Sequence, residues 1–504
     1  MGMCGRNAQS GLNGARAFRG DVNQEELGSM SSMGTVVASP RRYVIGLEGW
    51  ALQMEASLEQ TIQCADDGMG HLEEQLSVGT LELQRQALER AAQAKVDATP
   101  PKCPVCGRAL VRKERGHERS VQTRFGPVKL RRTRGWCRYC QQWRFPADAA
   151  LRLDQTSTAS PAVQEAAAML VAQMPVADAA VILERLTGVK WSPSTLDREA
   201  RRQGRRAEQQ RDELNSALAD WEQLVATAQA QAARGSASAQ PFTLVIEIDA
   251  WNIRERDGWG RTAALRQAGQ APARWHWVYG ATVFRLDQRG ETDGGRPMIS
   301  ERGSVMTRRG VDGLRELLWG EAVRRRLLEA QQVLVVADGA VWIWKLVEDR
   351  FGWAEQLLDW YHASQHLWAV ANALHGEGTK QARDWVEPLL ARLRDGQPTK
   401  VIRRLEQLEL TCQPSAAETV AREREYFQTH QGRMDYQKAT VNGWPLGSGA
   451  MESSCRQYQC RFKRTGQFWS ETGDEALLAL HDSWRNGRWR QLFPHIGCAD
   501  PSRN

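Results

Sequence analysis

Two pairs of cysteines are the residues whose types and spacing point most directly to chemistry. Cys103-Pro-Val-Cys106 and Cys137-Arg-Tyr-Cys140 each hold two thiols three positions apart, and 30 residues separate the two pairs. Two such pairs can surround one Zn²⁺ with four thiolates in tetrahedral geometry. The spacing therefore predicts a structural zinc site, in preference to a redox-active dithiol.

The segment between the two cysteine pairs is strongly basic. Because arginine and lysine neutralise phosphates, we expect this segment to contact DNA, with Arg131 and Arg132 as candidate contacts. The alternative is a solvated hairpin face, since the exposed surface of a hairpin must be polar in any case. The basic residues are Arg108, Arg112, Arg115, Arg119, Arg124, Lys129, Arg131, Arg132 and Arg134.

Three carboxylates farther along the chain predict a second metal site. Asp249 and Asp338 each close an apolar run with strand character, and Glu452 opens an expected helix. Carboxylates at the ends of adjacent strands converge, and their repulsion is tolerable only with cations between them. A third acid from a helix across the strand ends would complete a site for two Mg²⁺ or Mn²⁺ ions. Each acid also has a plainer explanation in solvation or the helix dipole, and Glu247 and Asp257 compete with Asp249.

The chain after Glu452 alternates cations with aromatic rings. Such a sequence suits DNA that is held beside a scissile phosphate, whereas an ordinary solvated helix face is the alternative. The predicted DNA contacts here are Arg456, Arg461, Lys463, Arg464 and Trp469.

These residues need elements to hold them, and the N-terminal half is expected to supply DNA-binding modules. Residues 1–40 lack apolar periodicity and predict a disordered leader, whereas residues 41–99 predict a helical segment. Residues 100–148 should form a zinc ribbon-like module that contains a β-hairpin. Residues 149–233 show a helix-turn-helix-like pattern of DNA-binding helices, for which an ordinary helical hairpin is the alternative.

The C-terminal half is expected to be a mixed α/β domain. A linker at 234–240 precedes it, and strand-like and helix-like runs share residues 241–490. Helical patterns at about 370–440 indicate an insertion, and residues 491–504 form a tail. The expected fold class is therefore a multidomain α+β chain. Strands are predicted at 244–249, 275–285, 332–338 and 357–361.

Composition limits the classes of protein that fit. The 504 residues carry 67 Lys+Arg against 60 Asp+Glu, a net charge of +7 that permits a polyanionic partner without requiring one. No stretch approaches the roughly 18 to 20 apolar residues that a membrane span needs, and no apolar run of a signal peptide opens the chain. We therefore expect a cytoplasmic protein that does not enter a membrane.

Several motifs together resemble one family. From about Pro100 onward, the chain resembles bacterial insertion-sequence transposases of the ISKra type, relatives of the Mutator-like DDE transposases. The resemblance is carried by the paired cysteines, Asp338-Gly-Ala-Val-Trp-Ile-Trp344, Leu358-Asp-Trp-Tyr-His362, Gly447-Ser-Gly-Ala-Met-Glu452 and Arg461-Phe-Lys-Arg-Thr-Gly-Gln-Phe-Trp469.

The resemblance implies an RNase H-like catalytic domain in which Asp249, Asp338 and Glu452 form a DDE triad. It also places Asp359 and His362 near the active site, as the C/D-x-x-H motif. The implied activity is binding to terminal inverted repeats, followed by Mg²⁺- or Mn²⁺-dependent cleavage and strand transfer without a covalent protein–DNA bond. The implied partners are double-stranded DNA at the transposon ends and target, and further copies of the chain in a homodimer or higher oligomer, in association with the bacterial nucleoid.

Two other functions fit the same residues. A non-catalytic zinc-containing DNA-binding protein derived from a transposase has no need to bring three acids together. A metal-dependent nuclease would cut DNA without joining it. Convergence of the three acids would distinguish a transposase from the non-catalytic DNA-binding protein. Joined DNA products would distinguish a transposase from the nuclease.

Overall fold

The computed structural model describes residues 68–219, 240–256, 261–271, 273–295, 297–465 and 467–494, with short pieces between 49 and 63 and between 223 and 230. Contacts divide the chain into two compact units, Met1–Thr80 and Leu81–Asn504. The predicted leader, the competing acid Asp257, most of the predicted linker and the tail from residue 495 lie outside the described residues.

Helix α2 (Met69–Ala98) lies in the predicted helical segment, and its second half belongs to the second unit. There its side chains bind the edge of a β-strand. The backbone N–H of Lys129 donates to Glu89, and the backbone N–H of Arg131 donates to Gln93. Glu89 and Gln93 are one helical turn apart, a spacing close to that of alternate residues along the strand. The helix therefore satisfies donors that an open strand edge would leave unpaired.

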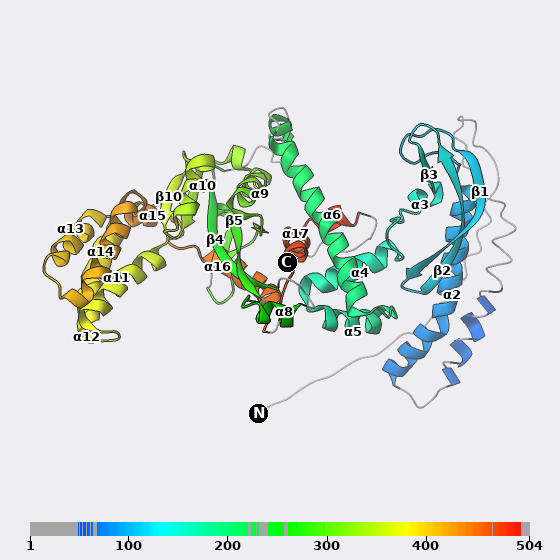
Figure 1. Cartoon of the computed structure of the whole chain (residues 1–504), viewed down its shortest axis with the longest axis horizontal. Coiled ribbons are helices and arrows are strands. Elements are labelled where there is room, and N and C mark those ends of the chain that lie inside the picture. The colour runs from blue at the N-terminus through cyan, green and yellow to red at the C-terminus, as the bar shows by residue number, and fades with distance from the viewer. Residues whose placement is uncertain are drawn as a thin grey trace, which may run out of the picture. The chain divides into compact units, whose positions relative to one another are not determined.

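The cysteine-rich module contains the predicted hairpin. Strands β1 (Val111–Thr123) and β2 (Gly126–Cys137) pair antiparallel, and the short strand β3 (Gln142–Arg144) pairs with the end of β2 (Figure 1). The helix α3 (Pro146–Ala150) follows. The hairpin and the paired cysteines are thus parts of one small sheet.

Three helices correspond to the predicted helix-turn-helix-like pattern, namely α4 (Pro161–Gln173), α5 (Val176–Thr187) and α6 (Pro193–Ala219). Ser160 caps α4 by accepting a hydrogen bond from the backbone N–H of Val163. Gly188 ends α5 in the left-handed conformation, with φ of 67°. Figure 1 shows that α6 runs beside α17 (Glu471–Arg485).

The contact between α6 and α17 depends on a glycine. A Cβ on Gly204 would lie 2.3 Å from the carbonyl oxygen of Ala476, so only a residue without a side chain lets the two backbones approach.

Replacing Gly204 by Ala should cost roughly 1 to 3 kcal/mol in steric overlap, because the methyl group must push two helix backbones apart. Ala is favoured over Gly within a helix by roughly 1 kcal/mol, so the net destabilisation should be at most about 2 kcal/mol. Urea unfolding measures the change in the free energy of unfolding. Gly70→Ala is the matched control, since no atom lies within 4 Å of a Cβ there. Equal effects of the two substitutions would contradict the close approach.

A five-stranded mixed sheet lies in the C-terminal half. Its strands have the spatial order β10-β9-β4-β5-β8; β4 runs parallel to β9 and β9 to β10, whereas β5 is antiparallel to β4 and β8. The strands predicted at 244–249, 275–285 and 332–338 are confirmed, whereas the one predicted at 357–361 is confirmed only at Leu357 and Leu358, because Trp360 begins a helix. Strand β8 is a fifth that the sequence pattern missed. The strands are β4 (Thr243–Glu255), β5 (Arg274–Arg285), β8 (Arg302–Thr307), β9 (Gln332–Ala337) and β10 (Glu355–Leu358).

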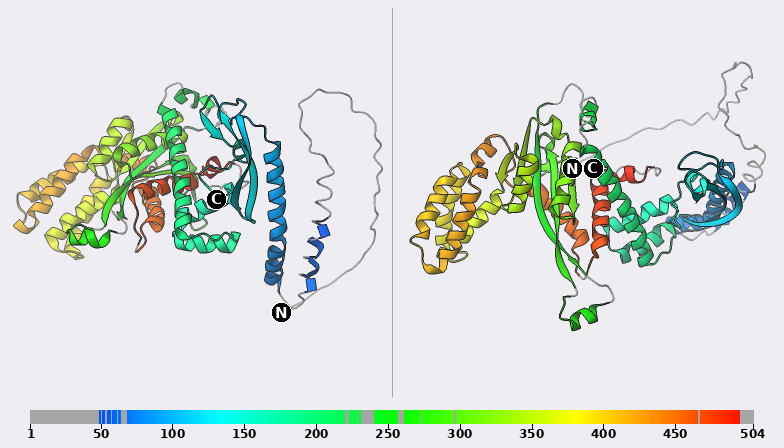
Figure 2. Two further views of the ribbon diagram at one scale, coloured as in Figure 1. Left: turned by 45° about the vertical axis from the view of Figure 1, so that its right-hand side comes forward. Right: turned by 45° about the horizontal axis from the view of Figure 1, so that its top comes forward.

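Helices connect these strands and follow them (Figure 2). A short helix α8 (Thr262–Gln267) and a separate ribbon of β6 (Arg289–Glu291) and β7 (Pro297–Ile299) lie between sheet strands in the sequence. The predicted helical insertion is present as α12, α13 and α14. The remaining helices are α9 (Gly310–Arg324), α10 (Val341–Phe351), α11 (Trp360–His375), α12 (Lys380–Arg394), α13 (Pro398–Glu409), α14 (Pro414–Thr429), α15 (Tyr436–Val441), α16 (Gly449–Phe462) and α18 (Trp489–Leu492).

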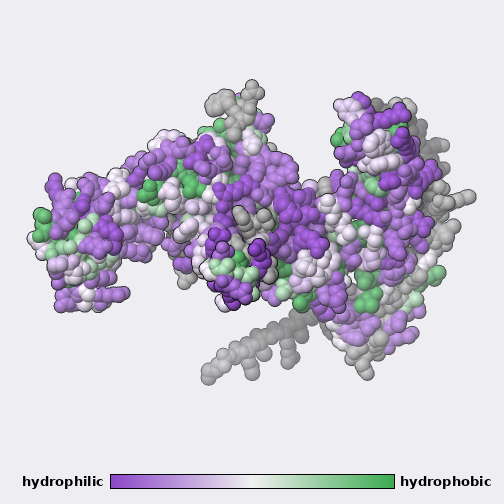
Figure 3. All heavy atoms as spheres, in the orientation of Figure 1, coloured by the Kyte–Doolittle hydropathy of each residue, from purple (hydrophilic) through white to green (hydrophobic). Residues whose placement is uncertain are grey.

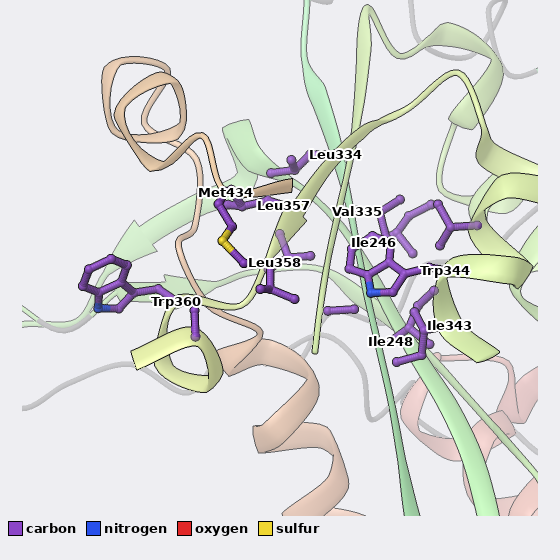
Figure 4. Packing of buried hydrophobic residues seen from close by; sticks show 14 of the residues in the cluster. Ile246, Ile248, Leu334, Val335, Ile343, Trp344, Leu357, Leu358, Trp360 and Met434 are labelled. Carbon is purple, nitrogen blue, oxygen red and sulfur yellow. The ribbon is translucent and has the colours of Figure 1, made fainter. Parts of the chain in front are cut away.

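Alternation of side chains along β4 separates its two faces. Ile246 and Ile248 are buried and belong to the same core cluster as Trp344 of α10 (Figure 4). Glu247 and Asp249 alternate with them and therefore point to the opposite face of the sheet. That face carries α16, so one strand delivers both acids to the helix that bears Glu452.

In the described part of the chain, none of the helices combines the length and the apolar character that crossing a lipid bilayer requires. The face shown in Figure 3 is largely hydrophilic, with small and separated hydrophobic areas.

Candidate functional site

The four cysteines of the two pairs come together. Their sulfur atoms all lie within 4.8 Å of one another, and among the described residues no other group of three or more metal-ligating side chains is so close. The Sγ atoms of Cys103 and Cys140 are 3.9 Å apart, and those of Cys106 and Cys137 are 3.5 Å apart. Sulfurs around a tetrahedral Zn²⁺ lie about 3.8 Å apart, given Zn–S bonds of about 2.3 Å. The cluster could therefore hold a zinc ion.

Local hydrogen bonds favour ionisation of two of these thiols. The backbone N–H of Cys106 lowers the pKa of Cys103 to about 6, and the backbone N–H of Cys140 lowers the pKa of Cys137. Burial and the neighbouring sulfurs raise the pKa of Cys140 to about 12. A bound cation would oppose this last shift, because the thiolate is the form that binds zinc.

Purified protein should contain one zinc ion per chain, and Cys103→Ser together with Cys137→Ser should lose it, since serine supplies no thiolate. Elemental analysis by mass spectrometry measures the content. Cys460→Ser is the matched control, because Cys460 is an exposed cysteine outside the cluster. Full zinc retention by the double variant, or a zinc-free wild-type protein, would contradict the assignment.

Not all of the basic residues of this module can contact DNA. Arg132 is buried, donates to Asp148 at 2.5 Å and lies over the ring of Phe145. Its prediction as a DNA contact is therefore wrong, because its guanidinium serves the interior of the module. Arg131 is exposed and pairs with Glu118 at 3.4 Å, so it stays a candidate.

Asp249 lies in β4, and Asp338 directly follows the end of the adjacent strand β9. Ile248 of β4 pairs with Ala337 of β9, so the acid that follows each residue stands at the same level of the sheet. Burial raises the pKa of Asp249 to about 6; the negative charge of Asp338 adds to the shift and His362 opposes it. The two acids and the histidine are therefore close enough to interact electrostatically.

The loop that contains Asp338 is fixed by hydrogen bonds. The backbone N–H of Ala340 donates to Asp338 Oδ1 at 2.8 Å, and the indole of Trp344 donates to the Asp338 carbonyl oxygen at 2.8 Å. The first contact forms a tight turn that leads into α10. The sequence Asp338-Gly-Ala thus fixes the Asp338 carboxylate at the end of β9. Its backbone leads directly into α10.

Glu452 lies in the first turn of α16. Three residues later, Cys455 contacts Asp249 at 3.8 Å. Burial raises the pKa of the Cys455 thiol, and the charges of Asp249 and Glu452 raise it further, so both acids lie near this thiol. The oxygens of the three predicted acids do not all lie within 4.8 Å of one another. Carboxylates without a cation between them repel, and their convergence on one metal position stays a prediction.

Glu247 anchors α16 to the sheet. It is buried, and its Oε2 accepts from the backbone N–H of Met451 at 2.6 Å. The backbone N–H of Ala450 also favours its charged form, but burial dominates and raises the pKa of Glu247 to about 8. Glu247, which competed with Asp249 for the first position of the predicted triad, therefore holds in place the helix that bears Glu452.

This pKa makes stability depend on pH. Between the ordinary glutamate pKa of about 4.3 and the value of about 8, the folded protein holds a proton that the unfolded chain releases. The free energy of unfolding should therefore fall as pH rises through this window, by at most about 1.4 kcal/mol per unit. Glu247→Gln cannot ionise and still accepts from Met451, so it should remove this contribution.

Urea unfolding of both proteins in EDTA from pH 5 to 8 tests the expectation. Glu425→Gln, a substitution of an exposed glutamate of α14, should leave the pH dependence of wild type unchanged. Parallel curves for wild type and Glu247→Gln would show that the Glu247 carboxyl does not hold the proton.

Asp359 is a buried helix cap. Its Oδ1 accepts from the backbone N–H groups of Tyr361 and His362, and its Oδ2 accepts from the backbone N–H and hydroxyl of Ser448 at 2.6 and 2.7 Å. Both oxygens are used, so Asp359 positions other groups and cannot be catalytic as predicted. It ties the start of α11, which bears His362, to the segment that enters α16.

Helix α14 of the insertion contacts the Asp338 loop, which sequence reasoning missed. His366 of α11 binds Glu423 at 2.5 Å and stacks on Tyr426, with ring centroids 3.6 Å apart. A Cβ on Gly339 would lie 2.3 Å from the Tyr426 ring, so the glycine after Asp338 admits that ring. His366 therefore joins α14 of the insertion to α11, beside the Asp338 loop.

Burial also changes the predicted DNA contacts of the C-terminal segment. Arg461 is 2% exposed and donates to the carbonyl oxygen of Val171 at 2.8 Å. Trp469 is 4% exposed and donates to the carbonyl oxygen of Phe462 at 2.7 Å. Both predictions of direct DNA contact are wrong, since these side chains pack between elements. The exposed candidates are Arg456, Lys463 and Arg464.

No protein-family model matches this chain, and no curated protein matches it significantly. The site itself consists of a four-cysteine cluster that could hold zinc, one acid in β4, one acid at the end of β9, and a third acid on α16.

Proposed function

We propose that this chain is a DNA transposase of an insertion sequence, which binds the terminal inverted repeats of its element and catalyses metal-dependent cleavage and strand transfer. The observation that carries the proposal is the placement of Asp249 and Asp338 at one level of adjacent parallel strands, beneath the helix of Glu452. Carboxylate oxygens are the ligands that Mg²⁺ and Mn²⁺ prefer.

The sheet supports an RNase H-like assignment for the catalytic domain. In chain order, β4, β5 and β8 form an antiparallel meander. Strands β9 and β10 then add on the other side of β4 and run parallel to it. The acids lie on the central strand β4 and at the end of its parallel neighbour β9. We rest this finer assignment on the family resemblance together with this order.

The residues divide the chemistry between them. Mg²⁺ or Mn²⁺, when bound, would activate the attacking oxygen and stabilise the leaving oxygen. Asp249, Asp338 and Glu452 would hold the cations, and His362 would donate a hydrogen bond to the scissile phosphate. Water would open the phosphodiester at the transposon end, and the freed 3′-hydroxyl would then attack the target, forming one P–O bond as another breaks.

The remaining modules would hold DNA. We assign binding of the transposon ends to the cysteine-rich module, with zinc in its cluster, and to α4, α5 and α6. Exposed cations of the cysteine-rich module and of the segment at and after α16 would neutralise backbone phosphates. Because strand transfer acts on two ends, we propose that at least two copies of the chain assemble on DNA, in the bacterial cytoplasm with the nucleoid. The exposed cations are Arg131, Arg456, Lys463 and Arg464.

One observation favours a second candidate function. The three acids do not form a group within 4.8 Å of one another, and a non-catalytic DNA-binding protein derived from a transposase would need no closer approach.

Asp249→Asn, Asp338→Asn and Glu452→Gln should each reduce cleavage and joining by roughly 100-fold or more, because each removes charge that binds the cation. The substrate is DNA carrying the ends that flank the gene, incubated with Mg²⁺, and gels resolve nicked from joined products. Binding in a mobility-shift assay should survive each substitution.

Glu425→Gln serves as the control for loss of one exposed carboxylate and should keep full activity. Full activity of all three acid variants would overturn the catalytic assignment. Nicks without joined products would identify a nuclease, and wild-type binding without cleavage in Mg²⁺ or Mn²⁺ would establish the non-catalytic alternative.

A further inference from the structure

Two tryptophans on β5 are exposed beside the candidate site. Trp275 and Trp277 are 55% and 54% exposed, and they stand two residues apart, on one face of the strand. A tryptophan leaves this much apolar surface in water at a cost, and exposed aromatic groups of this kind mark binding surfaces.

The ribbon that carries them extends past the acids. Strand β9 ends opposite Ile248, whereas β4 and β5 continue as a pair, with Asn252 opposite Trp277 and Arg254 opposite Trp275. Trp251 and Ile253, which alternate with these β4 residues, are buried against the C-terminal helices. One face of the ribbon is therefore packed, and the face with the tryptophans is open.

Cations accompany the two rings. The Lys463 ammonium lies 3.1 Å from the side-chain oxygen of Asn252 and 5.4 Å from the Trp275 ring centre. The Arg254 guanidinium lies 5.8 Å from the Trp275 ring and 5.1 Å from that of Phe468. In the described part of the chain, no carboxylate forms an ion pair with Lys463 or Arg254. Among the described residues, the surface thus combines flat rings with two cations that form no ion pair.

Lys463 also connects this surface to the site. It follows directly after α16, the helix that bears Glu452, and its side chain reaches the open face of the ribbon at Asn252. By alternation along β4, Asn252 and Arg254 lie on the face opposite Asp249, so a DNA strand that leaves Asp249 would pass around the edge of β4 that β9 leaves free, where Lys463 lies, before it reached Trp275.

We propose that Trp275 and Trp277 form a stacking platform for unpaired bases of a DNA strand next to the scissile position, with Lys463 and Arg254 contacting its phosphates. Base stacking requires an exposed ring and an unpaired base, and flanking cations supply affinity for the backbone. A protein partner is a weaker match, since two cations beside the rings, neither ion-paired to a described carboxylate, favour a polyanion. The location rests on the proposed function, whereas single-strand binding can be measured without catalysis.

The test is binding of a fluorescent single-stranded oligothymidine to the full, zinc-loaded chain in buffer without Mg²⁺ or Mn²⁺, followed by anisotropy. Trp275→Ala and Trp277→Ala should each weaken binding about 5- to 150-fold, as expected for the loss of one stacked base. Trp275→Tyr should recover most of the affinity because it restores a ring. Trp353→Ala is the matched control, since Trp353 is 64% exposed away from this ribbon and should leave affinity unchanged.

Three results would overturn the platform. One is unchanged single-strand affinity in both alanine variants. Another is an equal loss of affinity for a duplex of the same sequence, which would assign the ribbon to paired DNA. The third is conversion of a wild-type dimer to a monomer by either substitution in light scattering, which would assign the rings to a second copy of the chain.

Failure of the proposed function gives a different pattern. If wild type neither cleaves nor joins transposon ends but the tryptophan variants lose single-strand binding, the platform stands and the transposase does not. If wild type is active and the tryptophan variants bind the oligothymidine normally, the transposase stands and the platform does not.

Discussion

The buried carboxyl of Glu247 is the constraint on which the arrangement of the site depends. A carboxyl group without access to water must be protonated or surrounded by donors, and here the first backbone N–H groups of α16 supply the donors. This contact fixes α16 along β4. Cys455 then falls beside Asp249, and Glu452 lies one turn earlier on the same side of the helix. Asp359 performs the same task at the start of α11 and for the segment that enters α16.

A buried polar layer supports α16 from the other side. Tyr458 of α16 donates to Asp482 of α17 at 2.5 Å, and Arg211 of α6 pairs with Asp482 and with Glu475 of α17 at 3.4 and 2.7 Å. Glu475 also accepts from Thr307 at the end of β8. Buried ion pairs are costly to desolvate and contribute little net stability. Removing one partner, however, leaves the other charge buried and unpaired, which is strongly destabilising. The layer therefore specifies how three helices and one strand meet.

Local sequence patterns predicted most helices and strands. Which side chains are buried and which elements contact one another depends on tertiary packing, which local patterns do not encode. The paired cysteines, the hairpin and most sheet strands follow from spacing and alternation. Alternation could also have shown that Glu247 and Asp249 share one face of β4, but not which of them meets a helix N-terminus. The pairing of His366 with Glu423, 57 residues later, has no local signal. Arg461 was mistaken for a DNA contact because a basic stretch looks the same whether its side chains face water or a neighbouring helix.

The burial of Arg461 shows how the two halves of the second unit are joined. Its guanidinium donates to Val171 near the end of α4, His481 of α17 hydrogen-bonds Ala172, and the indole of Trp489 donates to Glu165. Residues of α4, α5 and α6 accordingly share one hydrophobic core with α16 and α17, although the predicted linker separates them in sequence. A helix-turn-helix-like region packed in this way cannot shift without disturbing α16. Because α16 also bears Glu452, a displacement of α4, α5 or α6 would reach this acid through a continuous packed core.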